Sequence, residues 1–208
     1  MIWDLDGVLL DNELQHIDAE LQTFEKFGLQ VPRETAEQYM GIRLEDYFRA
    51  IARRYWVRAP VDVMTRAHLG TLRRYYGEAF PLTPHADRVL EELGASRVQA
   101  LATNRERELA LLALERFGLL GRFQAAVYGD EVVRGKPDPE IYLKAASLLG
   151  VEPSACTVIE DSVNGLAAAK GAGMRVIIRL GGHNRHVDFT GADQVVDDLR
   201  EIPAILRR

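Results

Sequence analysis

Near its start the chain reads Ile2-Trp3-Asp4-Leu5-Asp6-Gly7, a short apolar run that ends in two acidic residues and a glycine. Asp4 and Asp6 are two positions apart, so in an extended chain their side chains project to the same side. In an open α/β sheet the ligand crevice lies at the carboxyl ends of the strands. The stretch therefore predicts two carboxylates that face one pocket. Because so few residues precede Asp4, we expect the first strand to be short or the gene start to be trimmed.

Further apolar runs favour a parallel sheet, because each is closely followed by a small or acidic residue and then by a helical pattern. They cover residues 98–101, 125–128, 157–159 and 176–178. The long segment between the first run and the second instead carries helical apolar stripes. These stripes cover about residues 14–24, 44–55 and 61–75. The sequence thus predicts a three-layer, Rossmann-like α/β core of residues 1–11 and 81–208 with an inserted α-helical cap of residues 12–80.

The composition excludes several classes of protein. The chain has 208 residues, 47% of them hydrophobic, and a net charge of −5, which is ordinary for a globular protein. Its basic residues are scattered, so we expect no nucleic-acid partner. No apolar run approaches the ~18 residues of a membrane span, and the start does not resemble an export signal. The single cysteine, Cys156, fits a reducing cytoplasm. Nothing demands more than a monomer.

Two further segments place polar groups after predicted strands. Thr103 and Asn104 follow the second run and precede a helix, so they could bind an oxyanion together with the free helix N–H groups. Capping of that helix is the alternative interpretation. In Arg134-Gly135-Lys136-Pro137 the glycine and the proline restrict the backbone on both sides of Lys136. This lysine is either a positioned charge for a phosphoryl oxygen or an ordinary surface lysine.

A second acidic pair, Glu160-Asp161, follows the fourth run. Mg²⁺ prefers oxygen ligands, usually carboxylates together with substrate phosphate and water. We therefore expect Asp4, Asp6 and Asp161 to be suitable ligands, with Glu160 binding the ion directly or through water. Acids that interact favourably with a helix dipole are the alternative, but this explains one carboxylate better than three.

Together these four segments resemble the motifs of the haloacid dehalogenase superfamily of phosphotransferases, in the order of that family and over nearly the whole chain. By this resemblance Asp4 is the nucleophile and Asp6 the general acid/base. Thr103 is the hydroxyl of the second motif, Lys136 the lysine of the third, and Glu160-Asp161 the magnesium-binding acids. The predicted cap is similar to that of the β-phosphoglucomutase-like and sugar-phosphate phosphatase branch, which Asp11-Asn12-Glu13 also supports.

The resemblance implies a Mg²⁺-dependent phosphatase of small phosphorylated metabolites that acts through an aspartyl-phosphate on Asp4. Sugar or sugar-acid phosphates are the expected substrates. Asp6 distinguishes the chain from the dehalogenases, which lack this acid. A phosphonate-cleaving enzyme needs a cap lysine, and the predicted cap holds only Lys26, on its first helix.

Three alternatives stay open at this point. A β-phosphoglucomutase-type enzyme is favoured by the spacing between Asp4 and His16, but phosphatases of the branch often carry the same histidine. The mutase pattern would place a phosphate-binding arginine at Leu44, whereas Arg43 lies one position earlier. We interpret His16 and Arg43 as substrate-binding residues, with Arg43 contacting a second anionic group. A receiver-like signalling domain and a catalytically silent binding module complete the alternatives.

Two features are interpreted as structural. The segment 182–188 contains two histidines, but it is flanked by glycine and no helix aligns its polar groups, so we expect a solvent-exposed loop. The cap tyrosines, which include Tyr47 and Tyr76, fit the apolar helix stripes at least as well as a substrate-binding face.

Overall fold

The computed structural model describes residues 1–39, 44–78 and 80–207. Its centre is a six-stranded parallel sheet in the order β3-β2-β1-β4-β5-β6. The strands are β1 (Ile2–Trp3), β2 (Ala100–Ala102), β3 (Ala125–Val127), β4 (Thr157–Glu160), β5 (Arg175–Arg179) and β6 (Gln194–Val196). The short β1 lies between β2 and β4, so the Asp4-Leu5-Asp6-Gly7 segment leaves the sheet at its centre.

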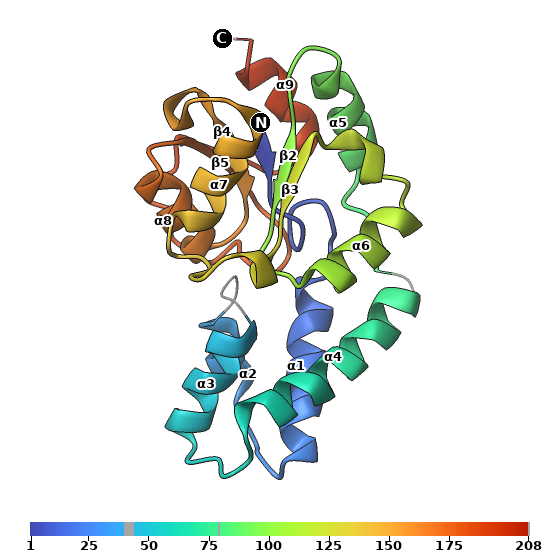
Figure 1. Ribbon diagram of the computed structural model, residues 1–208, viewed down its shortest axis with the longest axis vertical. Helices are drawn as coiled ribbons and strands as arrows, with labels where there is room; N and C mark the ends of the chain where they lie inside the picture. Colours follow the sequence, from blue (N-terminus) through green and yellow to red (C-terminus); the bar gives the residue numbers. More distant parts are fainter. Residues whose placement is uncertain (40–43, 79, 208) are drawn as a thin grey trace.

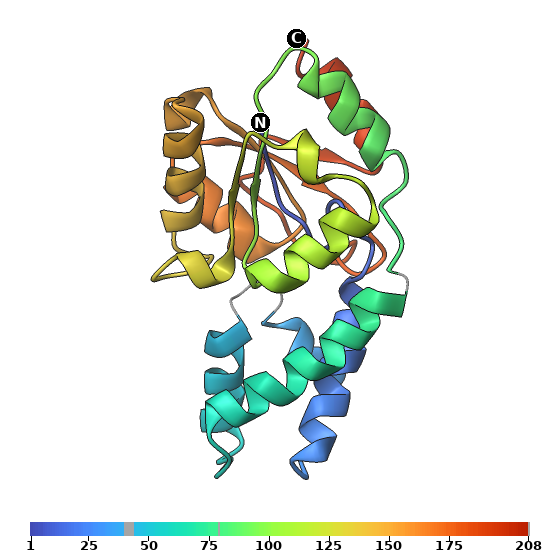
Figure 2. The same cartoon turned by 45° about the vertical axis from the view of Figure 1, so that its right-hand side comes forward.

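Helices cover both faces of the sheet, as Figure 2 shows. They are α5 (Ala86–Gly94), α6 (Arg107–Arg116), α7 (Glu140–Leu149), α8 (Val163–Gly171) and the short α9 (Ile202–Ile205). Alternate strand residues point to opposite layers. Trp3 packs in one core cluster with residues of α5, α6 and α9, whereas Ile2 packs in the other with residues of α7 and α8. The apolar residues of β1 therefore pack into two hydrophobic cores, one on each face of the sheet.

Four helices lie beyond the carboxyl end of the sheet (Figure 1). They are α1 (Glu13–Lys26), α2 (Arg33–Glu37), α3 (Leu44–Arg54) and α4 (Val61–Glu78). Phe24 of α1, Phe48 of α3 and Met64 of α4 form part of an apolar core that these three helices share. In addition, α1 and α4 contribute Ala19, Leu72 and Tyr76 to the core cluster that contains Trp3, so these two helices also pack against the sheet region.

The chain leaves the sheet region and returns to it at neighbouring positions. The Asp11 N–H donates to the Pro81 carbonyl at 3.0 Å, and the Thr83 N–H donates to the Leu9 carbonyl at 2.8 Å. We therefore propose a division into a core of residues 1–11 and 81–208 and a cap of residues 12–80. With these bounds, the two chain segments that connect core and cap are the ones joined by these hydrogen bonds.

The predicted α/β fold with its parallel sheet is confirmed. The sequence analysis missed β6, which has two exposed residues and one buried residue, and α2, a five-residue helix. Both are too short to show a clear apolar period. Within the described ranges, no helix combines the length and the apolar character that crossing a membrane requires.

Candidate active site

The four predicted motifs meet at the carboxyl end of the sheet. Asp4 continues β1, and its N–H donates to the Ile159 carbonyl at 3.0 Å. Thr103 follows β2, and Glu160 is the last residue of β4. Lys136 comes from the connection between β3 and α7. All four side chains line one cavity of about 60 Å³ that cap residues close from the other side.

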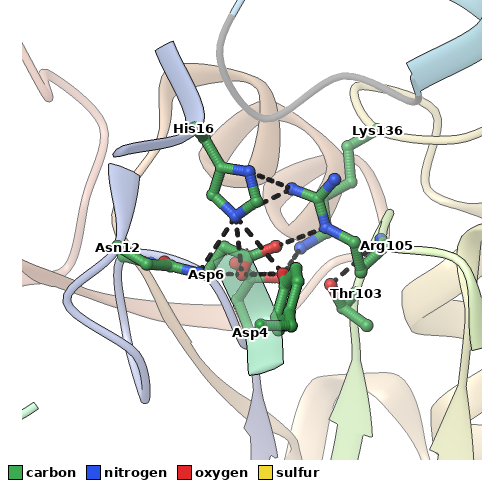
Figure 3. A network of polar contacts seen from close by, with 9 residues as sticks. Asp4, Asp6, Asn12, His16, Thr103, Arg105 and Lys136 are labelled. Carbon is green, nitrogen blue, oxygen red and sulfur yellow. Dashed lines mark hydrogen bonds and ion pairs between the residues drawn. The ribbon is translucent and has the colours of Figure 1, made fainter. Parts of the chain in front are cut away.

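Lys136 is the cation that lies between the acidic residues of this site. Figure 3 shows it together with Asp4. Its Nζ lies 2.6 Å from Asp4 Oδ1 and 2.6 Å from Glu160 Oε1, and it also donates to the Ala102 carbonyl at 3.1 Å. The residue is 3% exposed. Burial opposes its charge, but the two carboxylates raise the pKa of Lys136 above its ordinary value. Lys136 is therefore a positioned charge here and not a surface lysine.

Glu160 is saturated with hydrogen-bond donors from the protein. Its Oε1 accepts from Lys136 and, at 2.7 Å, from the Tyr142 hydroxyl. Its Oε2 accepts from the N–H groups of Asp161 and Ser162 and from Ser162 Oγ. A carboxylate has about four lone-pair positions, so Glu160 has little capacity left for a direct metal bond. This geometry favours contact with an ion through water or through its neighbours.

Asp4, Glu160 and Asp161 form the acidic group within the described residues whose ligand atoms are close enough for one ion, within 4.8 Å of one another. Burial, together with the neighbouring carboxylates, raises the pKa of Asp4 and of Asp161 well above their ordinary values. Such a surplus of buried negative charge is stabilised by a cation. Oxygen ligands of this kind fit a hard divalent ion, and Asp4 and Asp161 are the residues that could hold it.

The Asp6 carboxylate faces a different set of groups (Figure 3). Oδ1 accepts from Asn12 Nδ2 at 2.6 Å and from the Tyr76 hydroxyl at 2.8 Å, and Oδ2 accepts from Arg105 Nε at 2.8 Å. Although burial opposes ionisation, Arg105 and His16 lower the pKa of Asp6 well below its ordinary value. Asp6 was also predicted as a metal ligand, but its carboxylate lies outside the acidic group of Asp4, Glu160 and Asp161.

Thr103 and Asn104 both line the cavity. Thr103 Oγ1 accepts from the Arg105 N–H at 3.1 Å, and Asn104 Oδ1 accepts from the Lys136 N–H at 3.1 Å. The following helix, α6, has Glu106 at its N-cap. The capping interpretation of Thr103 and Asn104 is therefore wrong, and Asn104 instead joins the second motif to the third.

His16 and Arg43 were predicted to bind substrate. His16 is 3% exposed and its Nε2 lies 3.0 Å from Asn12 Nδ2 and 3.4 Å from Asp6 Oδ1. It lines the cavity beside Asp6. Arg43 lies outside the described residues, and its role stays a prediction.

The sequence analysis missed several residues of the site. Tyr76 and Arg105 both bind the Asp6 carboxylate. The expectation of a solvent-exposed loop over 182–188 is wrong in part, because His183 and Asn184 are buried. His183 Nε2 lies 2.7 Å from Asp161 Oδ2, and Asn184 Nδ2 donates to the Asp161 carbonyl at 2.7 Å. In the sequence, the adjacent polar residues His183 and Asn184 were the feature that could have indicated a functional site. Only the fold shows that they lie beside Asp161.

Gly7 is required by the close approach of two motifs. Its φ is +71°, and a Cβ there would lie 1.8 Å from Asp161 Oδ2. We expect Gly7→Ala to lower the free energy of unfolding by about 2–4 kcal/mol and to reduce turnover, since Asp161 must move. Urea unfolding measures the first effect.

Gly28 has φ +72° with open space around it, so the control Gly28→Ala should cost only about 1 kcal/mol. Equal losses for the two variants would contradict the role of Asp161.

Comparisons with known proteins agree with this geometry. The sequence model described as haloacid dehalogenase-like hydrolase matches residues 1–178. The chain is 32% identical over 178 residues to a phosphorylated carbohydrates phosphatase of Thermotoga maritima, covering 85% of this chain and 82% of the relative. It is 29% identical over 209 residues to a β-phosphoglucomutase of Bacillus subtilis, covering 97% and 90%.

A solved structure shares the whole architecture. CbbY from Rhodobacter sphaeroides in complex with xylulose-(1,5)-bisphosphate superimposes with a TM-score of 0.85 at 29% identity, and the match covers 96% of this chain and 94% of that one. The family model, the relatives and the fold all lead to the same assignment. The chain belongs to the family of haloacid dehalogenase-like hydrolases.

Proposed function

We propose that this protein is a Mg²⁺-dependent phosphatase that hydrolyses small phosphomonoesters, of sugars or of related metabolites, through an aspartyl-phosphate on Asp4. The observation that carries the proposal is the position of the Asp4 carboxylate. Lys136 binds Oδ1, which leaves Oδ2 to attack phosphorus. Mg²⁺ held by Asp4 and Asp161 would neutralise charge on the phosphoryl oxygens and on the acidic group.

In the first step Asp4 Oδ2 forms a bond to phosphorus while the ester P–O bond breaks. The departing alkoxide takes a proton from the Asp6 carboxyl group, which is ionised while Arg105 binds it and takes up this proton from solvent when the substrate displaces that donor. In the second step Asp6 accepts a proton from water, the resulting hydroxide attacks phosphorus, and Asp4 is released together with inorganic phosphate. Lys136 and the polar groups of Thr103 and Asn104 stabilise charge on the transferring group.

The surroundings of Asp6 support a role that depends on substrate. Its oxygens accept from Asn12, Tyr76 and Arg105, so one of these donors must give way before the leaving group can reach the carboxyl. Tyr76 lies on α4, and cap movement would release it. The cavity of about 60 Å³ is also far smaller than the ~300 Å³ of typical ligand pockets, so substrate entry requires the cap to open.

Metal removal tests the proposal. We expect phosphate release from a panel of sugar phosphates and an aryl phosphate to fall by about 100-fold or more when a chelator removes Mg²⁺, and to return when Mg²⁺ is added in excess. Release that is equally fast with chelator would contradict the metal dependence.

The same substrate panel, assayed for both phosphate release and isomerisation, tests the mutase alternative, which the Bacillus subtilis relative favours. A mutase passes the phosphoryl group from Asp4 to a second hydroxyl of the sugar and not to water. We expect phosphate release to exceed isomerisation. Faster conversion of β-glucose 1-phosphate to the 6-phosphate would make the mutase the better assignment.

A further inference from the structure

The cap contributes its own polar groups to the wall of the cavity. Glu20 on α1, Tyr39 after α2 and Tyr47 on α3 line it together with the motif residues. Glu20 follows His16 by four residues, so both side chains lie on the same face of α1. Because His16 lies beside Asp6, Glu20 is placed one helical turn further along the cavity. This position suits contact with the part of a substrate that departs.

Tyr47 presents a buried hydroxyl beside the Glu20 carboxylate at the cavity wall. The residue is 2% exposed, and its ring packs against Phe24, Tyr39 and Phe48 with centroids 5.4–5.7 Å apart. Its hydroxyl forms no hydrogen bond of ordinary geometry with the residues that the structure describes, although burial and the nearby Glu20 carboxylate raise the pKa of Tyr47. Buried polar groups are almost always hydrogen-bonded in folded proteins. A hydroxyl and a carboxylate that line a cavity without a hydrogen bond of ordinary geometry between them therefore point to a ligand that bridges them.

The charges of the cavity lining disfavour a second anion on the substrate. Its cations, in the described part of the chain, are Arg105 and Lys136, and both already bind carboxylates. The cap side adds two further carboxylates, those of Glu13 and Glu20. A second phosphate or a carboxylate on the leaving group would approach this negative charge, and the lining residues that the structure describes offer it no free counter-charge. This charge pattern disfavours the predicted contact between Arg43 and a second anionic group, and with it the expected sugar-acid phosphates.

We propose that Glu20 and Tyr47 form a binding site for hydroxyl groups of an uncharged leaving group, and that Glu20 selects monophosphates of polyols and neutral sugars against esters with a second anionic group. The inference rests on the proposed phosphatase function. A ligand hydroxyl can donate to Glu20 and accept from Tyr47 at the same time. An ammonium group could donate to Glu20 but offers no acceptor to the Tyr47 hydroxyl.

Glu20 also gives the selectivity a pH dependence. Burial raises the pKa of Glu20 to about 7, so its negative charge, and with it the discrimination against anionic esters, should grow between pH 6 and pH 8. Other titratable groups on the surrounding elements are Glu13 and His16 on α1, Tyr39 after α2, Tyr47 on α3, His68 and Tyr76 on α4, and Arg105 after β2. The Glu20→Gln variant separates the contribution of Glu20 from the contributions of these groups.

The experiment uses two substrates with the same carbon chain. Sorbitol 6-phosphate ends in a hydroxymethyl group where 6-phosphogluconate carries a carboxylate. We expect wild type at pH 8 to prefer sorbitol 6-phosphate in kcat/KM by about tenfold or more, and Glu20→Gln to remove most of this preference, mainly by lowering KM for 6-phosphogluconate. At pH 6 the wild-type preference should shrink, whereas that of Glu20→Gln should stay constant. Tyr47→Phe should raise KM for sorbitol 6-phosphate.

Controls separate the possible failures. Glu25→Gln makes the same change on the exposed side of α1 and should leave the preference unaltered. If an aryl phosphate is hydrolysed but the preference is the same in wild type and Glu20→Gln, the inference is wrong and the phosphatase function stands. A preference for glucosamine 6-phosphate over glucose 6-phosphate would likewise overturn it in favour of a cation site. If no ester is hydrolysed, the proposed function fails and the inference falls with it.

Discussion

Asp4→Asn is expected to reduce phosphate release by about 10⁴-fold or more, because an amide cannot replace the attacking carboxylate oxygen. The folded protein should not be weakened. Burial and the neighbouring carboxylates raise the pKa of Asp4 well above its ordinary value, so its ionised form costs stability at neutral pH. We therefore expect the Tm of Asp4→Asn to equal or exceed that of wild type.

Turnover assays and thermal melting of the same preparations check both parts of this prediction. Asp87→Asn on α5 is a matched control, because Asp87 is exposed and lies outside the cavity lining. It should retain wild-type turnover. Turnover of Asp4→Asn near the wild-type rate would show that another residue is the nucleophile, and a large fall in Tm would show that Asp4 is mainly structural.

Lys136→Met is expected to lower both activity and stability. Without the lysine, Asp4 and Glu160 stay buried with no counter-charge between them, which costs about 3–5 kcal/mol in comparable buried pairs. Activity should fall by about 10²–10³-fold, because the charge that binds Asp4 Oδ1 and faces the transferring phosphoryl group is lost. Urea unfolding and phosphate release measure the two effects.

The loss of stability in Lys136→Met should depend on pH in a defined direction. Without Lys136 the folded-state pKa of Glu160 and Asp4 rises, so protonation between pH 7 and pH 5 relieves the buried negative charge. The stability difference from wild type should therefore shrink as the pH falls. Lys170→Met is the matched control, because Lys170 forms a surface ion pair with Asp193, worth at most about 1 kcal/mol. Equal losses in the two lysine variants would contradict the central role of Lys136.

Much of the fold could be predicted because apolar runs and helical stripes have local periods. The strands at 157–160 and 175–179 are buried on both faces, so they appear as continuous apolar runs. Strand β6 has only one buried residue and gives no such signal. The α1, α3 and α4 helices match the predicted stripes, since an amphipathic helix repeats its apolar positions over several turns.

For the candidate site, the sequence by itself determined which residue types end the strands: Asp4 and Asp6, Thr103 and Glu160-Asp161, with Lys136 in a restricted loop. Those segments are recognisable because each is short and continuous. Only the tertiary structure decided the partners of each group. Tyr76 and Arg105 are 70 and 99 residues from Asp6 in the chain, and His183 is 22 residues from Asp161. A hydrogen bond depends on distance in space, and no local pattern records the packing of cap against core that sets those distances.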